Sequence, residues 1–210
     1  GIYNFGYIAI PVTQVVFDEE VVGILLVFNV GIELAIWTVG VLVFNGSITK
    51  ENLKKALSPP VIAMFIAVPL NLTGAVDFIP TALMTVIGLL ANCLIPIGLF
   101  MIGASLLDLF QELPIKRALP YAFGGIVMRI GILPFVILAP LVFLPDLSPE
   151  LRSVLIIQCA MPSGVFPIVM AKYYNGQPSV ALAVVLGTCS VAIFTIPLWL
   201  KFAISMWGTP

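Results

Sequence analysis

Long apolar runs, each sufficient to cross a lipid bilayer, constrain this chain more than any other feature. Residues 118–144 and 180–200 are the clearest, because about 20 apolar residues span the hydrocarbon core as a helix, and Arg129 is the only charged residue in either run. Of the 210 residues, 61% are hydrophobic and 9% charged, which is too little polar surface for a soluble domain. The sequence therefore predicts an all-α polytopic membrane protein, multi-pass in the inner or plasma membrane of a cell. The other expected spans are 21–44, 61–73, 79–107 and the interrupted run 154–171.

The residue types that the chain lacks exclude several classes of function. There is no histidine, which rules out Ser/His and Cys/His nucleophilic sites and histidine metal ligands within the chain. The three cysteines lie far apart in apolar runs and indicate neither a disulfide framework nor a metal site. No basic patch is available to bind nucleic acid. We therefore expect a protein that is not an enzyme and that has no cofactor or metal.

The run 154–171 contains a motif that disfavours a continuous helix. Met161–Pro167 reads MPSGVFP, so Pro162 and Pro167 remove two backbone donors and Gly164 between them adds flexibility. Unpaired backbone at membrane depth is tolerated only inside protein or beside a wet cavity, and transporters use such breaks to hold substrate. A simple proline kink is the structural alternative.

A similar break is expected at the other end of the chain. Residues 1–17 are too short to span and look like the second half of a broken helix. Pro11 and Pro167 occupy similar places in their half-helices, and residues 33–39 align with 190–196. The charge distribution gives the two copies opposite orientations, which is typical of an inverted-repeat transporter with two crossing broken helices.

The expected organisation has three parts. Residues 1–44 form the end of a first inverted repeat, with a half-helix and one full span. Residues 45–60 form a lysine-rich cytoplasmic linker, as the positive-inside rule indicates. Residues 61–203 form a complete second five-helix repeat, with its broken helix near 158–167. On this interpretation the chain is an N-terminally truncated piece of a longer protein. Residues 18–20 and 108–117 are expected to be polar connections.

Three stretches carry a resemblance to a known family, and they are Met161–Pro167 with Ala171–Asn175, Asn4–Pro11, and the helix from Ile95 to Leu106. They resemble the auxin efflux carrier family, which includes plant PIN-type carriers and bacterial malonate-permease-like transporters. The resemblance implies ten helices in two inverted repeats, a scaffold domain and a transport domain, and a crossing of the fourth and ninth helices near Asn4 and Pro162. It also implies that Asn4 contacts substrate. One departure is Ser163, where the PIN-type carriers have glutamine.

Four candidate site residues lie at the two breaks. Asn4 is able to hold a substrate oxygen or to cap the half-helix that follows it. Pro162 creates the second break. Ser163 and the backbone at Gly164 precede a half-helix whose positive dipole end attracts an anion.

Two candidates are charged groups within spans. Arg129 costs about 2.5 to 3.5 kcal/mol at the centre of a membrane; it is expected to bind a substrate carboxylate, or else to pair with Glu33 or a helix-terminal carbonyl. Glu33 is a candidate proton carrier because burial raises the pKa of a carboxyl group; otherwise it has a structural role.

These features predict a secondary transporter of a small organic anion, a carboxylate, that works by alternating access at the helix crossing. The expected partners are that anion, the lipid bilayer, protons through Glu33, and a second copy of the chain. A sodium-coupled bile-acid-type symporter, a channel and a non-transporting scaffold are the alternatives. An intramembrane serine protease is disfavoured because Met161 stands where such enzymes need glycine two residues before the serine.

Overall fold

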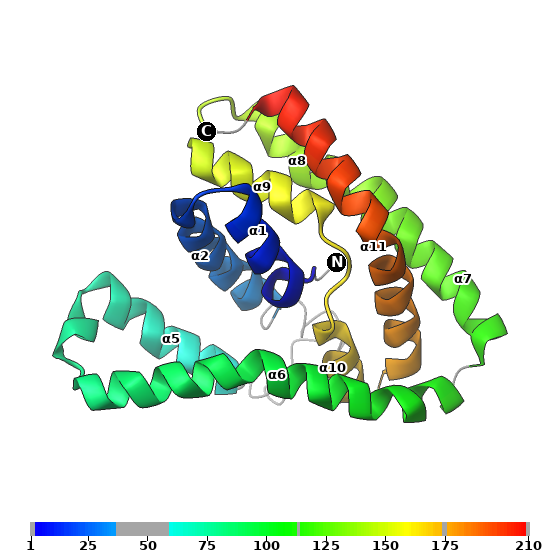
Figure 1. Cartoon of the computed structure of the whole chain (residues 1–210), viewed down its shortest axis with the longest axis horizontal. Helices are drawn as coiled ribbons and strands as arrows, with labels where there is room; N and C mark the ends of the chain where they lie inside the picture. Colours follow the sequence, from blue (N-terminus) through cyan, green and yellow to red (C-terminus); the bar gives the residue numbers. More distant parts are fainter. Residues whose placement is uncertain (1–2, 37–58, 113, 174–175, 209–210) are drawn as a thin grey trace, which may run out of the picture. The chain divides into compact units, whose positions relative to one another are not determined.

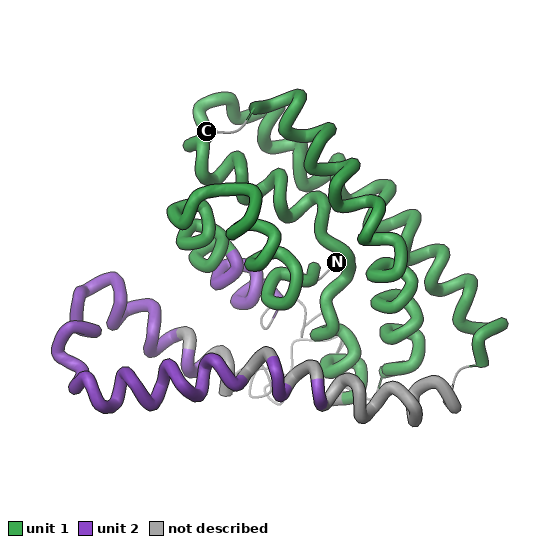
Figure 2. Tube along the Cα trace, in the orientation of Figure 1, with its two compact units in different colours: residues 1–28, 104–210 green, residues 29–103 purple. Residues whose placement is uncertain are grey.

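The computed structural model describes residues 3–36, 59–112, 114–173 and 176–208. These residues are helical apart from short connections, and their only β pairing is an isolated antiparallel bridge between Tyr3 and Ser163. The chain divides into two compact units, one of residues 1–28 and 104–210 and one of residues 29–103 (Figure 2). The division reflects contacts rather than internal symmetry, so the expected repeat boundaries remain predictions.

Two long helices dominate the first unit. One is continuous over Ile115–Phe143 and the other is α11 (Pro178–Trp207), and both are long and apolar enough to cross a membrane. They run side by side (Figure 1). The elements of this unit are η1 (Phe5–Ala9), α1 (Ile10–Val16), the start of α2 (Glu19–Ala35), the end of α6 (Thr81–Glu112), α7 (Ile115–Ile126), η4 (Val127–Ile132), α8 (Leu133–Phe143), α9 (Pro149–Ala160), α10 (Phe166–Tyr173) and α11.

The core of the first unit is α9, which packs against α8, α11 and η1. Pro149 occupies its first turn, where the missing amide hydrogen has no helical partner to lose, and the Ser148 hydroxyl caps the helix by accepting from the Leu151 amide at 3.3 Å. All residues from 153 to 160 are buried. The part of α9 that leads into the next segment is therefore enclosed by protein on every side.

The helix Ile115–Phe143 contains a π-helical turn, η4, directly before Leu133 and Pro134. In an α-helix the Ile130 carbonyl would accept from the amide of residue 134, but proline has no amide hydrogen and its ring crowds that carbonyl. The backbone widens instead, and the Leu133 amide donates to Met128 five residues back. The Ile130 carbonyl accepts a hydrogen bond from the Trp199 indole Nε1 of α11 at 3.0 Å.

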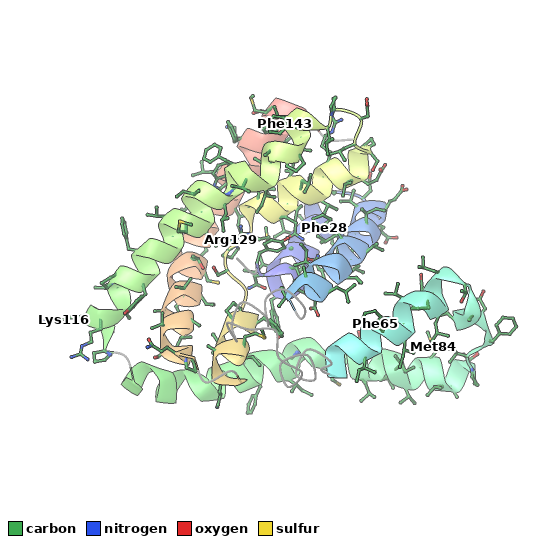
Figure 3. All side chains as sticks on the ribbon, turned by 180° about the vertical axis from the view of Figure 1, so that it is seen from behind. Phe28, Phe65, Met84, Lys116, Arg129 and Phe143 are labelled. Carbon is green, nitrogen blue, oxygen red and sulfur yellow. The ribbon has the colours of Figure 1, made fainter. Side chains whose placement is uncertain are left out.

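The second unit contains α5 (Pro59–Leu72), η3 (Ala75–Phe78), the start of α6 and the end of α2. Gly74 connects α5 to η3 with φ 70°, a left-handed conformation that glycine adopts without steric cost. Many large apolar side chains of this unit are exposed, including Phe65 and Met84 (Figure 3). Such a surface suits contact with lipid.

Two expected connections are present but shorter than predicted. The connection between α1 and α2 consists of Phe17 and Asp18 only, because α2 begins at Glu19, where acidic side chains in the first turn interact favourably with the helix dipole. The polar stretch 108–117 is mostly helical, since α6 extends to Glu112 and α7 begins at Ile115. The helices separate at Pro114, which lacks the amide hydrogen that a continuous helix would need. The linker up to residue 58 and the end of the expected span 21–44 lie outside the described residues.

Candidate functional site

The run 154–171 is broken, and the N-terminal segment is paired with the break. Helix α9 ends at Ala160, α10 begins at Phe166, and Met161 is extended with φ −73° and ψ 138°. The Asn4 amide donates to the Pro162 carbonyl at 2.9 Å, next to the bridge between Tyr3 and Ser163. We call residues 3–4 and 161–165 together the paired break.

Side chains from distant parts of the sequence donate to two backbone carbonyls at the broken helix. Pro162 has no hydrogen to donate to the Gln158 carbonyl four residues earlier, and the Arg129 Nη2 atom donates to that carbonyl at 2.9 Å. The Ser163 carbonyl lies before the start of α10, and the Cys189 thiol is a weak donor to it at 3.8 Å. Two side chains distant in sequence therefore satisfy the broken backbone.

Helix α11 fixes the extended segment through Thr188, which is fully buried. Its Oγ1 accepts a hydrogen bond from the Ser163 amide at 3.2 Å. The hydroxyl donates to the carbonyls of Val184 and Val185, with Oγ1 lying 2.9 and 3.1 Å from their oxygen atoms. The Ser163 amide and carbonyl are thus both engaged by α11, which positions the rest of the segment.

Asn4 and Gly164 meet where the two segments of the paired break cross. Asn4 is 6% exposed, and its Oδ1 accepts from the Tyr7 amide at 3.2 Å, so it is the N-cap of η1. A Cβ atom on Gly164 would lie 2.7 Å from the Tyr3 carbonyl oxygen. Only glycine permits this close approach of two backbones.

Arg129 is a buried cation beside the paired break. It lies between Lys116, near the start of the continuous helix, and Phe143 at its end (Figure 3). Arg129 is 2% exposed and is the only charged residue among the buried residues that the structure describes. Its guanidinium carbon is 4.9 Å from the centroid of the Tyr3 ring. Its Nε and Nη1 atoms have no hydrogen-bond partner in the described part of the chain.

The structure therefore brings five of the six candidate residues together: Asn4, Arg129, Pro162, Ser163 and Gly164. Of the structural partners expected for Arg129, the helix-terminal carbonyl is the one that is seen, at Gln158. Glu33 lies on α2 in the second unit with a partly exposed side chain. Glu33 and the paired break therefore belong to different units, and the expected role of Glu33 as a proton carrier remains a prediction.

Sequence reasoning did not identify Tyr3, Thr188, Cys189 or Trp199 as donors or contacts of the broken and widened helices. One local signal was present: each proline inside a helical run marks a carbonyl four residues earlier that needs another donor. This rule points to the Gln158 and Ile130 carbonyls. It does not identify their donors, which lie 29 and 69 residues away in the chain.

The fold and the site define a helical membrane protein whose broken helix encloses polar backbone and a buried cation. A family model described as "Membrane transport protein" matches residues 47–200. The chain belongs to this family, which confirms the resemblance to auxin efflux carriers. It is therefore a membrane-embedded protein of a transporter family that is not enzymatic. Comparison with curated proteins and with solved structures gives no match.

Proposed function

We propose that this protein is a secondary transporter of a small organic anion, a carboxylate, which binds at the paired break in the inner or plasma membrane of the cell. The observation that supports this most is the positive sign of the buried charge there. An isolated cation in a medium of low dielectric is strongly unfavourable, and Arg129 has no carboxylate partner among the described residues. An anionic substrate would supply the missing charge.

Two helix termini add to the attraction for an anion. η1 begins directly after Asn4 and α10 begins directly after Val165, so the amino ends of both face the paired break. The amino end of a helix carries a partial positive charge. Asn4 offers a side-chain amide at the same place, so a carboxylate would meet positive potential from Arg129 and from both termini.

The paired break suits alternating access because, within the described residues, few bonds join its two segments. The described contacts are the bond from the Asn4 amide to the Pro162 carbonyl and the bridge between Tyr3 and Ser163. If these segments separated first towards one side of the membrane and then towards the other, a bound anion would be exposed to each side in turn. Proton coupling through Glu33 is part of this proposal, because it would compensate the negative charge carried with the substrate.

The test is uptake by the intact protein in proteoliposomes. The probes are radiolabelled acetate, malonate, malate and benzoate, each compared with its neutral amide. We expect saturable uptake of at least one carboxylate, acceleration by the unlabelled anion on the opposite side, and no uptake of the amides. Complete dependence on sodium would favour the sodium-coupled symporter, and a steady anion conductance would favour a channel. Absence of uptake for every carboxylate would contradict the proposal.

A further inference from the structure

The Arg129 guanidinium is only partly used by its surroundings. Nη2 donates to the Gln158 carbonyl, whereas Nε and Nη1 are buried and have no acceptor in the described residues. A buried donor without an acceptor loses the hydrogen bonds that water would provide. Such a group invites an acceptor from outside the protein.

The unused hydrogens have a geometry that fits a carboxylate. A guanidinium has two edges that each present a pair of parallel N–H bonds, and both edges include one of the two Nη2 hydrogens. Only one Nη2 hydrogen points at the Gln158 carbonyl. The other, together with Nε or Nη1, leaves a complete two-donor edge. A carboxylate would bind to that edge without displacing the Gln158 carbonyl.

The Tyr3 ring covers the cation in this structure. The guanidinium carbon lies 4.9 Å from the ring centroid, and Tyr3 belongs to the segment that is paired with residues 161–165. A cation–π contact is weaker than a two-bond contact with a carboxylate. Movement of the Tyr3 segment would uncover Arg129, and the same movement would open the paired break.

We propose that Arg129 binds the substrate carboxylate directly, and that the Tyr3 ring covers its guanidinium in the empty site and competes with the substrate for it. This inference rests on the proposed function and deepens it, because it assigns the substrate-binding group and the group that the substrate displaces. Tyr3 thereby lowers the apparent affinity and links binding of the carboxylate to separation of the two segments.

The first test compares two conservative substitutions by carboxylate uptake. Arg129→Lys keeps the charge but removes the two-donor edge, so we expect the half-saturation concentration to rise by about tenfold or more. Arg152→Lys is the matched control. Arg152 also donates to backbone carbonyls, those of Trp207 and Pro145 at 3.3 Å each, but it lies at the end of the bundle away from the paired break. We expect no change for this control.

The second test removes the competing ring. Tyr3→Leu should lower the half-saturation concentration by about threefold or more, because the lost cation–π contact favoured only the empty state. Tyr3→Phe restores a ring and should return the value towards that of the wild type. Tyr7→Leu removes a ring from the neighbouring helix and is the control, because Tyr7 makes no cation contact with any residue that the structure describes. A purely structural role for Tyr3 would not produce tighter binding on its removal.

The outcomes separate the two proposals. If the wild type carries a carboxylate but Arg129→Lys keeps its half-saturation concentration, or Tyr3→Leu binds no more tightly, this inference is overturned and the proposed function stands. If the wild type carries no carboxylate, the proposed function itself fails. Thermal stability in detergent shows whether each variant is folded. If Arg129→Lys is unfolded, the comparison of Tyr3→Leu with Tyr3→Phe tests the inference by itself.

Discussion

Three backbone carbonyls that accept hydrogen bonds from side chains show how single residues shape this site. The carbonyls of Gln158, Ile130 and Ser163 each lie four residues before a proline and receive a side-chain donor from elsewhere, respectively Arg129, Trp199 and Cys189. A buried carbonyl without a donor costs about 1–3 kcal/mol. The donors therefore stabilise backbone that takes no part in regular helical bonding.

Gly164→Ala should disrupt the paired break. The new Cβ would lie 2.7 Å from the Tyr3 carbonyl oxygen and 3.4 Å from the Asn4 Cα atom, so the two backbones would have to separate. Overpacking of this kind costs about 1–3 kcal/mol. We expect loss of most carboxylate uptake together with a lower melting temperature in detergent.

Gly6→Ala is the control for that substitution, because a Cβ atom there has no neighbour within 4 Å. Alanine in η1 should preserve uptake and raise stability slightly, since alanine favours helix more than glycine does. Equal loss of uptake in both variants would show that the close approach at Gly164 is not the cause.

How far the sequence predicts this site depends on the range of the interactions. Pro162, Gly164 and Pro167 were enough to predict the break, and Asn4 was recognised as a helix cap, because both are local effects. Arg129 was identified as a costly buried charge. Its contact with the Gln158 carbonyl joins helices 29 residues apart in the chain, and sequence alone does not establish which helix faces which.

At the scale of elements, the same local chemistry gives two different results. Around Pro134 the helix continues through a π-helical turn, whereas around Pro162 it stops at Ala160 and resumes at Phe166. The difference follows from the neighbours. A second proline and a glycine follow Pro162, and the extended segment gains partners in Tyr3, Asn4 and Thr188. If the chain only kinked at Pro162 and stayed helical, its contacts with these three residues would be lost.

Pro162→Ala should reduce transport strongly while expression stays intact. An alanine amide would compete with Arg129 for the Gln158 carbonyl and would allow α9 to extend by at least one residue. The Pro162 carbonyl would then turn away from the Asn4 amide. Carboxylate uptake and the amount of protein in the membrane are the measurements.

Pro149→Ala is the matched control on the same helix. Proline in the first turn of α9 removes an amide hydrogen that has no helical partner. We expect unchanged uptake for this variant. Normal flux through Pro162→Ala would contradict a role for the break in transport.

At the scale of the whole molecule, the support for the site is a pair of closely packed helices. A Cβ atom on Gly187 of α11 would lie 2.7 Å from the Ala122 Cβ atom, and one on Gly125 of α7 would lie 2.7 Å from a Val184 methyl group. Small residues let helix backbones approach closely within a membrane. The helix that carries Thr188 and Cys189 is thereby fixed against the helix that carries Arg129.

Gly187→Ala should lower the stability of the protein by about 1–3 kcal/mol, because the backbone of α7 leaves no room for the added methyl group. The measurement is the thermal unfolding midpoint in detergent. Gly124→Ala places its methyl group where nothing lies within 4 Å and is the control. Equal midpoints for the two variants would show that the contact between α7 and α11 tolerates separation.

The class of molecule was predictable at this scale, and its internal organisation less so. Composition and apolar runs predicted a helical membrane protein, and the family match to residues 47–200 establishes the membrane transporter family. Sequence did not predict where α2 begins or where α6 ends, because charged residues at helix ends are compatible with both helix and loop. The inverted repeat depends on weak similarity between apolar segments and remains a prediction.

The most direct test of the central claim is the accessibility of position 163. Ser163→Cys, in the intact protein with its native cysteines replaced, would be treated with a membrane-impermeant thiol reagent added to either side of sealed proteoliposomes. The paired break as an alternating-access carboxylate site predicts labelling from both sides, slowed on both by the transported carboxylate and not by its neutral amide. Labelling from only one side, or labelling that the carboxylate leaves unchanged, would contradict it.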